Sequence, residues 1–223
     1  MFRSRLHDGE LTLVLLLVAL QAHAGEDDWY GGITAERIEL RLGENTREWD
    51  IDTWFGGDYR KLIARSEGTT GGDEEENAEL QLLASFAVGP YSDAYSGIRV
   101  EDLGGQTIAG IVIGLQGDAR YLIDYNLAAF ATENGDVLLR AELERQFLLT
   151  QRWIVEARLE VNASLSDSDL RNTDAGFSQS EVGFRLRYEV TRRFAPYVGW
   201  EWKQEFRDSK SDTYALVGLS FSY

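Results

Sequence analysis

Charged side chains recur at every second position in several segments of this chain, and their types suit ion chemistry. Positions 140, 142 and 144 carry Arg, Glu and Glu, and positions 156, 158 and 160 carry Glu, Arg and Glu. Carboxylate oxygens bind hard cations, and guanidinium groups pair with carboxylates. The formal net charge of −16 favours cations as partners and disfavours nucleic acid. These patterns indicate a protein that handles cations.

The candidate cation ligands are carboxylates from such alternating segments and from one acidic loop. The alternating set comprises Glu142, Glu144, Glu156, Glu160, Glu181 and Glu201, and the loop set comprises Asp73, Glu74, Glu75 and Glu76. The alternating set has two interpretations, a structural network of Glu and Arg pairs or an acidic path that concentrates cations. The loop is either a solvated surface loop or a weak site for divalent cations, and its spacing does not match an EF-hand.

An alternation of period two requires extended strands, because successive side chains of a strand point to opposite faces. From Ala215 to Tyr223 one face is apolar, the other carries mostly small or polar residues, and the chain ends on an aromatic ring. That combination is typical of the closing strand of a bacterial outer-membrane barrel. An amphipathic soluble sheet is the alternative, with its apolar face in a core and its charged face in water.

The chain is predicted to be all-β, a transmembrane antiparallel up-and-down β-barrel of about twelve strands. Its 22 Gly, two Pro and 12% aromatic residues suit many strands joined by tight turns. The predicted strands are 34–43, 47–56, 59–68, 77–87, 94–102, 106–117, 120–133, 136–148, 152–166, 178–190, 195–207 and 213–223. Short turns are expected on the periplasmic side, and the longer polar segments 68–77, 166–178 and 207–212 on the outside.

If the apolar faces meet lipid, the charged faces line the barrel interior, with acids in excess of bases. The predicted luminal acids are Glu39, Glu48, Asp50, Asp52, Glu79, Glu101, Asp124, Glu142, Glu144, Glu156, Glu160, Glu181, Glu189, Glu201 and Glu205. The predicted luminal bases are Arg37, Arg41, Arg65, Arg99, Arg140, Arg158, Arg185, Arg187 and Lys203.

The first 24 residues have the pattern of a secretory signal peptide. Arg3 and Arg5 form a basic start, residues 11–20 form an apolar core too short to span a bilayer, and residues 22–24 form an Ala-His-Ala cleavage site. A retained membrane anchor is the alternative. The predicted organisation is a cleaved signal peptide at 1–24, a short periplasmic lead-in at 25–32 and an outer-membrane barrel at 33–223.

Cleavage of this signal would leave a chain without histidine, methionine or cysteine. His7, His23 and Met1 all lie within the first 24 residues, and the chain has no Cys. Outer-membrane lipases and proteases use histidine as a general base, so no enzymatic activity is expected. Hydrolysis by two carboxylates is the remaining enzymatic alternative, although acids on nearly every strand make no pair distinctive.

Five ordered segments of the chain carry distinctive sequences. They are 56–68 (GGDYRKLIARSEG), 76–83 (ENAELQLL), 141–151 (AELERQFLLTQ), 184–189 (FRLRYE) and 194–202 (FAPYVGWEW). In this order and spacing they resemble the copper resistance protein B family of outer-membrane proteins, and the resemblance extends over nearly the whole chain from Trp29 onward. It implies a role in copper tolerance or copper homeostasis at the outer membrane of a Gram-negative cell, with copper ion binding as a family attribute.

The chain resembles a short form of this family, without the Met- and His-rich segment that longer members carry before the barrel. Thioether and imidazole groups suit copper best, so no tightly bound cofactor is expected. A copper ion would bind weakly, through carboxylates, backbone carbonyls or Tyr. The expected partners are outer-membrane lipid, copper or other cations, and periplasmic copper resistance proteins.

The predicted function is therefore that of a cell outer-membrane protein of copper resistance or copper ion homeostasis, which handles copper or other cations passively through an acidic lumen. A general small outer-membrane channel, or a structural barrel without specific copper binding, is the alternative. A barrel enzyme is a weaker third hypothesis.

Overall fold

The computed structural model describes residues 29–72, 76–168, 171 and 173–223, which form twelve strands. The strands are β1 (Tyr30–Leu42), β2 (Thr46–Gly56), β3 (Arg60–Thr70), β4 (Asn77–Gly89), β5 (Ser92–Leu103), β6 (Gln106–Ala119), β7 (Ile123–Thr132), β8 (Val137–Leu148), β9 (Trp153–Ser164), β10 (Gly176–Tyr188), β11 (Phe194–Glu205) and β12 (Lys210–Ser222). Each predicted strand is present, and only the strand ends differ from the prediction. No helix of this described part is long and apolar enough to cross a membrane.

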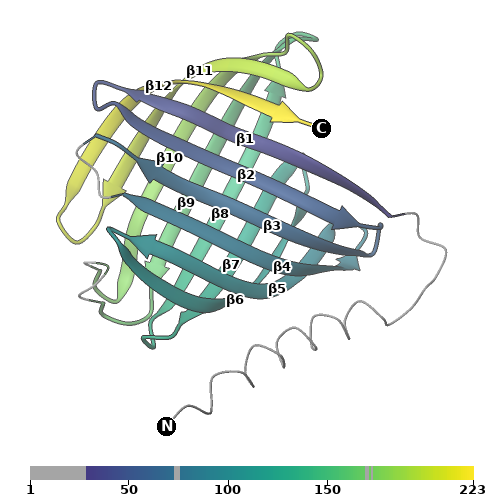
Figure 1. Cartoon of the computed structure of the whole chain (residues 1–223). Coiled ribbons are helices and arrows are strands. Elements are labelled where there is room, and N and C mark those ends of the chain that lie inside the picture. The colour runs from purple at the N-terminus through teal and green to yellow at the C-terminus, as the bar shows by residue number, and fades with distance from the viewer. Residues whose placement is uncertain (1–28, 73–75, 169–170, 172) are drawn as a thin grey trace.

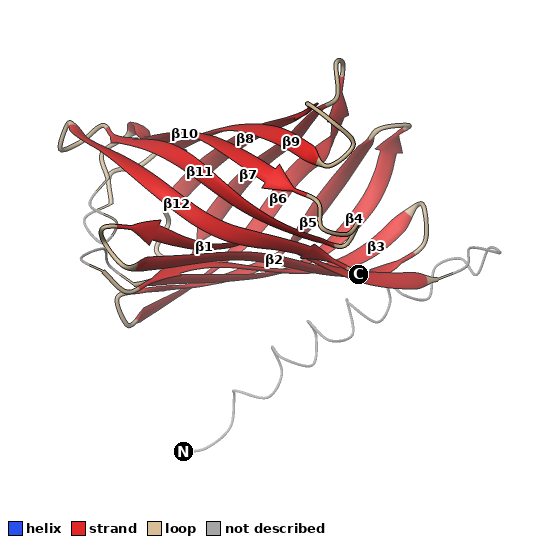
Figure 2. Ribbon diagram, turned by 90° about the horizontal axis from the view of Figure 1, so that it is seen from above, coloured by secondary structure: helices blue, strands red, loops and turns tan. Residues whose placement is uncertain are grey.

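The strands form one closed antiparallel barrel in which each strand pairs with its neighbours in the sequence (Figure 1). Closure joins β1 to β12, with Thr34 opposite Ser222. At the end of this seam the backbone N–H of Tyr223 donates to the carbonyl oxygen of Ile33 at 2.8 Å. Figure 2 shows β12 between β11 and β1, where the sheet closes. A closed barrel leaves no unpaired strand edge, as a sheet in lipid requires.

The outward faces of the strands are apolar and the inward faces are largely polar. On β6, Ile111 and Ile113 are both 60% exposed, because they point away from the barrel. Arg185 and Glu201, by contrast, are each only 1% exposed inside it. A soluble sheet protein would bury its apolar faces instead, so this arrangement confirms the predicted membrane barrel.

One wall of the interior is apolar and fills part of the bore. Ile63, Val112 and Phe130 pack there with Tyr95. Tyr95 lies across β6 because its partner on that strand is Gly114, where a Cβ would come within 2.3 Å of the Tyr95 ring. The free bore is therefore narrower than the backbone cylinder, as is usual in small barrels.

A β-bulge in β1 changes which side chains face the interior. Ala35 pairs with Ile51 and Arg37 pairs with Asp50, so Glu36 is an extra residue opposite β2. Glu36 and Arg37 are neighbours in the chain, yet both line cavities of the interior. Simple alternation would send one of the two outward, and the bulge is what admits both.

The start of β1 and the C-terminus lie at the same end of the barrel, which we call the N/C rim (Figure 1). The short turns after β2, β4, β6, β8 and β10 belong to this rim. The opposite end, the loop rim, carries the two longest connections, after β3 and β9. The connection after β11 was predicted to be long, but it spans only 206–209 because β12 begins at Lys210. β1 begins at Tyr30, inside the segment 25–32 that was predicted as a lead-in, because Gly31 and Gly32 continue the pairing with β2.

Candidate functional site

The barrel interior holds two large cavities, one toward each rim. The N/C cavity has a volume of 710 Å³ and is lined by side chains of β1 to β8. The loop cavity has a volume of 880 Å³ and includes residues of the loop-rim connections. Glu67 of β3 lines both, so the two cavities meet at this residue.

A group of ion pairs, which we call the septum, lies between the two cavities. It consists of Arg37, Arg140 and Arg158 with Asp50, Glu67 and Glu142. Arg140 Nη1 donates to Glu67 Oε2 at 2.8 Å, and the other two arginines donate to their carboxylates at 2.5 Å. The three arginines line the loop cavity, whereas Asp50 and Glu142 line the N/C cavity. The septum is therefore polarised, with its negative side toward the N/C cavity.

A second ion-pair network connects β1, β10 and β11. Arg185 Nη2 donates to Glu39 Oε2 and to Glu201 Oε2, at 3.0 Å in each case. Arg41 donates to Glu201 Oε1 at 2.9 Å, and the Tyr197 hydroxyl donates to Glu39 Oε1 at 2.9 Å. Buried charges persist only when their partners satisfy them. These residues therefore have a structural role, joining strands that are distant in sequence.

The two cavities differ in charge. The N/C cavity is lined, among the described residues, by ten carboxyl side chains and two cationic ones. The ten are Glu36, Asp50, Asp52, Asp58, Glu67, Asp93, Asp118, Asp124, Glu142 and Glu144, and the two cations are Lys61 and Arg65. The described lining of the loop cavity is balanced, with acids Glu48, Glu67, Glu79, Glu101, Glu160, Asp174, Glu181, Glu205 and Asp208 and bases Arg37, Arg41, Arg99, Arg140, Arg158, Arg171, Lys203, Arg207 and Lys210.

Five carboxylates of the N/C cavity form no ion pair within the described part of the chain. They are Glu36, Asp58, Asp118, Asp124 and Glu144. Asp118 stands opposite Asp124, and Asp124 stands opposite Glu144, so three acids lie in one row across β6, β7 and β8. Like charges directly opposite one another destabilise a sheet. A cation in this cavity would offset that repulsion.

The alternating set of predicted ligands is mostly engaged in ion pairs and hydrogen bonds. Glu142 and Glu160 accept from Arg158, Glu156 accepts from Arg187, Glu201 accepts from Arg41 and Arg185, Glu181 accepts from Gln179, and Glu144 accepts from Gln146. Of these six acids, Glu142 and Glu144 line the N/C cavity. Across the residues that the structure describes, no group of three or more His, Cys, Asp or Glu is arranged to hold a metal ion.

The predicted loop ligands fall mainly beyond what the structure describes. Asp73, Glu74 and Glu75 lie outside the described residues, and Glu76 is exposed and accepts a hydrogen bond from the Thr70 hydroxyl at 2.9 Å. A cation site in this loop stays a prediction.

Five acids of the N/C cavity are missing from the predicted luminal set: Glu36, Asp58, Glu67, Asp93 and Asp118. Glu67 shares the alternation of Arg65 and was detectable from it. Asp118 is placed by its pairing with Asp124, which depends on the register of β6 against β7. For Glu36 the sequence signal is less direct. The apolar residues of β1 occupy odd-numbered positions up to Ala35 and even-numbered positions from Ile38 onward. Such a shift in the alternation indicates a β-bulge between them.

Comparison with protein families matches most of the described chain. The family model described as "Copper resistance protein B precursor (CopB)" matches residues 29–216. A curated relative named "Copper resistance protein B" from Escherichia coli is 35% identical over 188 residues, which cover 83% of this chain and 64% of the relative. A "Copper resistance protein B homolog" from Pseudomonas syringae pv. tomato is 37% identical over 158 residues, covering 71% of this chain and 54% of the relative. The chain thus spans less than two thirds of the length of either relative.

Solved structures share the barrel fold at low sequence identity. The NanC porin aligns with a TM-score of 0.59 at 15% identity, covering 86% of this chain and 99% of that porin. The KdgM porin, in a structure titled as a complex with disordered oligogalacturonate, aligns with a TM-score of 0.54 at 14% identity, with coverage of 86% and 99%. The matching family and fold are those of outer-membrane barrels, not of an enzyme.

Proposed function

Because the chain belongs to the copper resistance protein B family, we propose that it serves copper resistance by handling copper and other cations passively in its acidic lumen. The single observation that carries this proposal is the N/C cavity, where carboxylates outnumber cationic side chains ten to two among the described residues. An acidic cavity with low-dielectric walls concentrates cations and repels anions.

The orientation of the barrel in the membrane determines which compartment the N/C cavity faces. The protein resides in the outer membrane, and barrels there have short turns on the periplasmic side and longer loops outside. The N/C rim, with its short turns, accordingly faces the periplasm. The N/C cavity would therefore take up cations from the periplasm, while the septum separates it from the charge-balanced loop cavity.

The ligand chemistry of the cavity predicts that metal ions bind weakly and that the affinity differs from one metal ion to another. Residues 29–223 contain no histidine, methionine or cysteine, so carboxylate oxygens are the principal donors. Simple N and O sites bind Cu²⁺ more tightly than the other divalent ions of the first transition row. Copper would therefore be preferred over zinc and manganese without a dedicated copper geometry.

A structural barrel without copper binding is the second candidate. It is supported by the septum, in which three arginines pair with carboxylates that would otherwise meet a passing ion. If those pairs persist in the membrane, the lumen is a closed, crosslinked interior. Conductance separates the two candidates, because a closed interior passes no ions.

Calorimetric titration of the refolded barrel with Cu²⁺ tests the proposal, alongside bilayer conductance of the same preparation. We expect saturable Cu²⁺ binding that weakens about tenfold in Glu36→Gln or Glu144→Gln, since one neighbouring charge contributes on the order of 1–4 kcal/mol. Glu205→Gln is the matched control, because it removes a luminal acid of the loop cavity.

Either of two results would contradict cation handling in the N/C cavity. One is the absence of Cu²⁺ binding together with the absence of conductance, which would favour the structural barrel. The other is equal weakening by Glu205→Gln and Glu144→Gln, which would place binding elsewhere.

A further inference from the structure

A group of arginines at the N/C rim forms no ion pair with any carboxylate in the described part of the chain, although the chain as a whole is strongly acidic. Arg120, Arg145, Arg152, Arg192 and Arg193 lie on or beside the turns that follow β6, β8 and β10. None of them forms an ion pair with a carboxylate that the structure describes, in contrast to the arginines of the septum. We call this group the basic arc.

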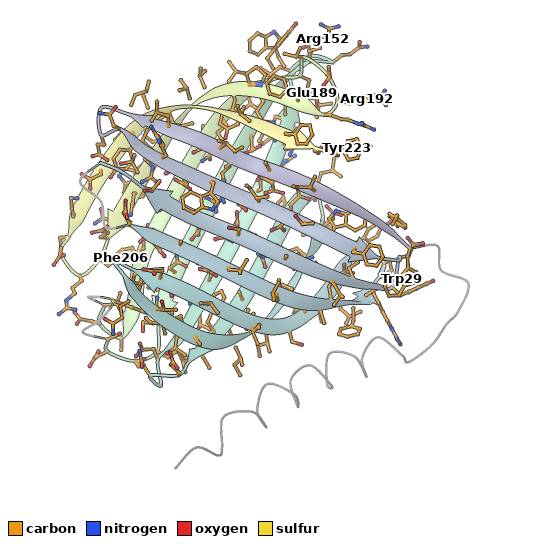
Figure 3. The ribbon with its side chains drawn as sticks, in the orientation of Figure 1. Trp29, Arg152, Glu189, Arg192, Phe206 and Tyr223 are labelled. Atoms are coloured by element: carbon orange, nitrogen blue, oxygen red, sulfur yellow. The ribbon has the colours of Figure 1, made fainter. Side chains whose placement is uncertain are left out.

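The turns of the basic arc are rich in cations and poor in acids. They read RYL at 120–122, LTQR at 149–152 and EVTRR at 189–193, with Glu189 the single acid. Figure 3 shows Arg152, Glu189 and Arg192 at the same end of the barrel as Tyr223, with Phe206 at the other end. The cations are therefore gathered on one side of one rim.

Three arginines of the arc lie against aromatic rings of the outer surface. Arg145 stacks on Phe147 at 4.7 Å from the ring centroid, and Arg193 stacks on Tyr223 at 4.7 Å. Arg152 Nη1 donates to the Tyr188 hydroxyl at 3.3 Å. A guanidinium stacked on a ring still presents N–H groups at its edges.

The surface around these arginines continues into the lipid-facing surface of the barrel. Arg145 pairs with Ile123 and Ala157, on the outward face that also carries the exposed Leu143 and Phe147. An arginine on this face is tolerated close to the membrane interface, where its head group reaches the polar layer. The arc therefore lies where hydrocarbon gives way to phospholipid head groups.

We infer that the basic arc binds the phosphate groups of anionic phospholipids in the periplasmic leaflet. Guanidinium matches phosphate geometry with paired hydrogen bonds, and each cation near an anionic membrane surface adds attraction. The aromatic rings stacked against Arg145 and Arg193 lie on the lipid-facing surface, which favours a lipid over a soluble acidic protein. This binding is independent of any cation in the lumen.

Native mass spectrometry of the detergent-purified barrel with added phosphatidylglycerol or phosphatidylcholine tests the inference. We expect phosphatidylglycerol to be retained in preference, and the variant Arg145→Gln/Arg192→Gln/Arg193→Gln to retain at least about fivefold less of it. The matched control Arg47→Gln/Arg207→Gln/Lys210→Gln removes the same charge at the loop rim and should bind like the parent protein.

Folding of each variant is checked by its mobility on gels without boiling, and Arg145→Lys/Arg192→Lys/Arg193→Lys should recover part of the binding. Equal retention of the two lipids would overturn the inference, as would equal loss in the control. Inorganic phosphate serves as a competitor, and full displacement of the lipid by it would assign the arc to free phosphate instead.

Discussion

At the scale of single residues, the position of each charge in the lumen decides whether it stabilises the barrel or attracts an ion. Arg185 is 1% exposed and bonds to both Glu39 and Glu201, so these three residues stabilise the fold. Glu144 is hydrogen-bonded only to a glutamine amide in the described chain and stands in a row of acids. The same residue type thus serves structure in one place and electrostatic attraction in another.

Arg185→Gln is expected to lower the free energy of unfolding by about 3–5 kcal/mol, because it leaves the buried Glu39 carboxylate without its cation and removes one of the two cations that hold Glu201. Urea unfolding in lipid vesicles measures the loss. The double variant Glu39→Gln/Arg185→Gln should be closer to the parent protein, since the Glu39 charge is also removed. Arg47→Gln, at an exposed outward position, should change stability by less than about 0.5 kcal/mol. A loss below about 1 kcal/mol in Arg185→Gln would contradict the structural role of this network.

At the scale of elements, local irregularities determine what the strands present. The bulge in β1 brings both Glu36 and Arg37 into the barrel interior, where Glu36 lines the acidic N/C cavity and Arg37 belongs to the septum.

The turn between β6 and β7 is a second irregular element, because of its backbone conformation. Tyr121 and Leu122 have φ of 69° and 56°, a left-handed conformation that side chains other than Gly, Asn and Asp disfavour.

Leu122→Gly is therefore expected to stabilise the barrel by about 1 kcal/mol, because glycine adopts positive φ without steric cost. Leu149→Gly is the matched control: Leu149 is also exposed in a short turn of the N/C rim, but its φ is not positive. The control should lose about 0.5–1 kcal/mol through chain entropy. Unfolding in urea would distinguish the two, and a loss in both variants would show that the Leu122 turn is unstrained.

At the scale of the whole molecule, closure makes the barrel a single unit. β12 pairs with β11 on one side and β1 on the other, and its last residues bond to the start of β1. Without β12, two strand edges would face lipid with unsatisfied backbone groups, each costing several kcal/mol.

Deletion of residues 213–223 should accordingly abolish the compact form that resists detergent. Gel mobility before and after boiling measures that form directly. Removal of residue 208 from the connection after β11 is the control and should leave the compact form intact, because surface loops tolerate length changes. Survival of the compact form after the larger deletion would contradict closure through β12.

The sequence by itself determined the number of strands, their approximate limits and which face of each is apolar. It could do so because a strand alternates its side chains regardless of what lies opposite, and because lipid and lumen demand opposite polarity. The alternation of β8 and β9, for example, predicted that Glu142, Arg158 and Glu160 share the interior, and the three are ion-paired there.

The tertiary structure alone decided which charges are paired and which remain available. Arg185 and Glu39 are 146 positions apart in the chain, and they meet only because β10 and β1 face one lumen. Glu36 enters that lumen through a bulge, which breaks the alternation on which the sequence prediction depends. The acidic N/C cavity and the balanced loop cavity result from such pairings, because register and closure distribute the arginines unevenly along the barrel axis.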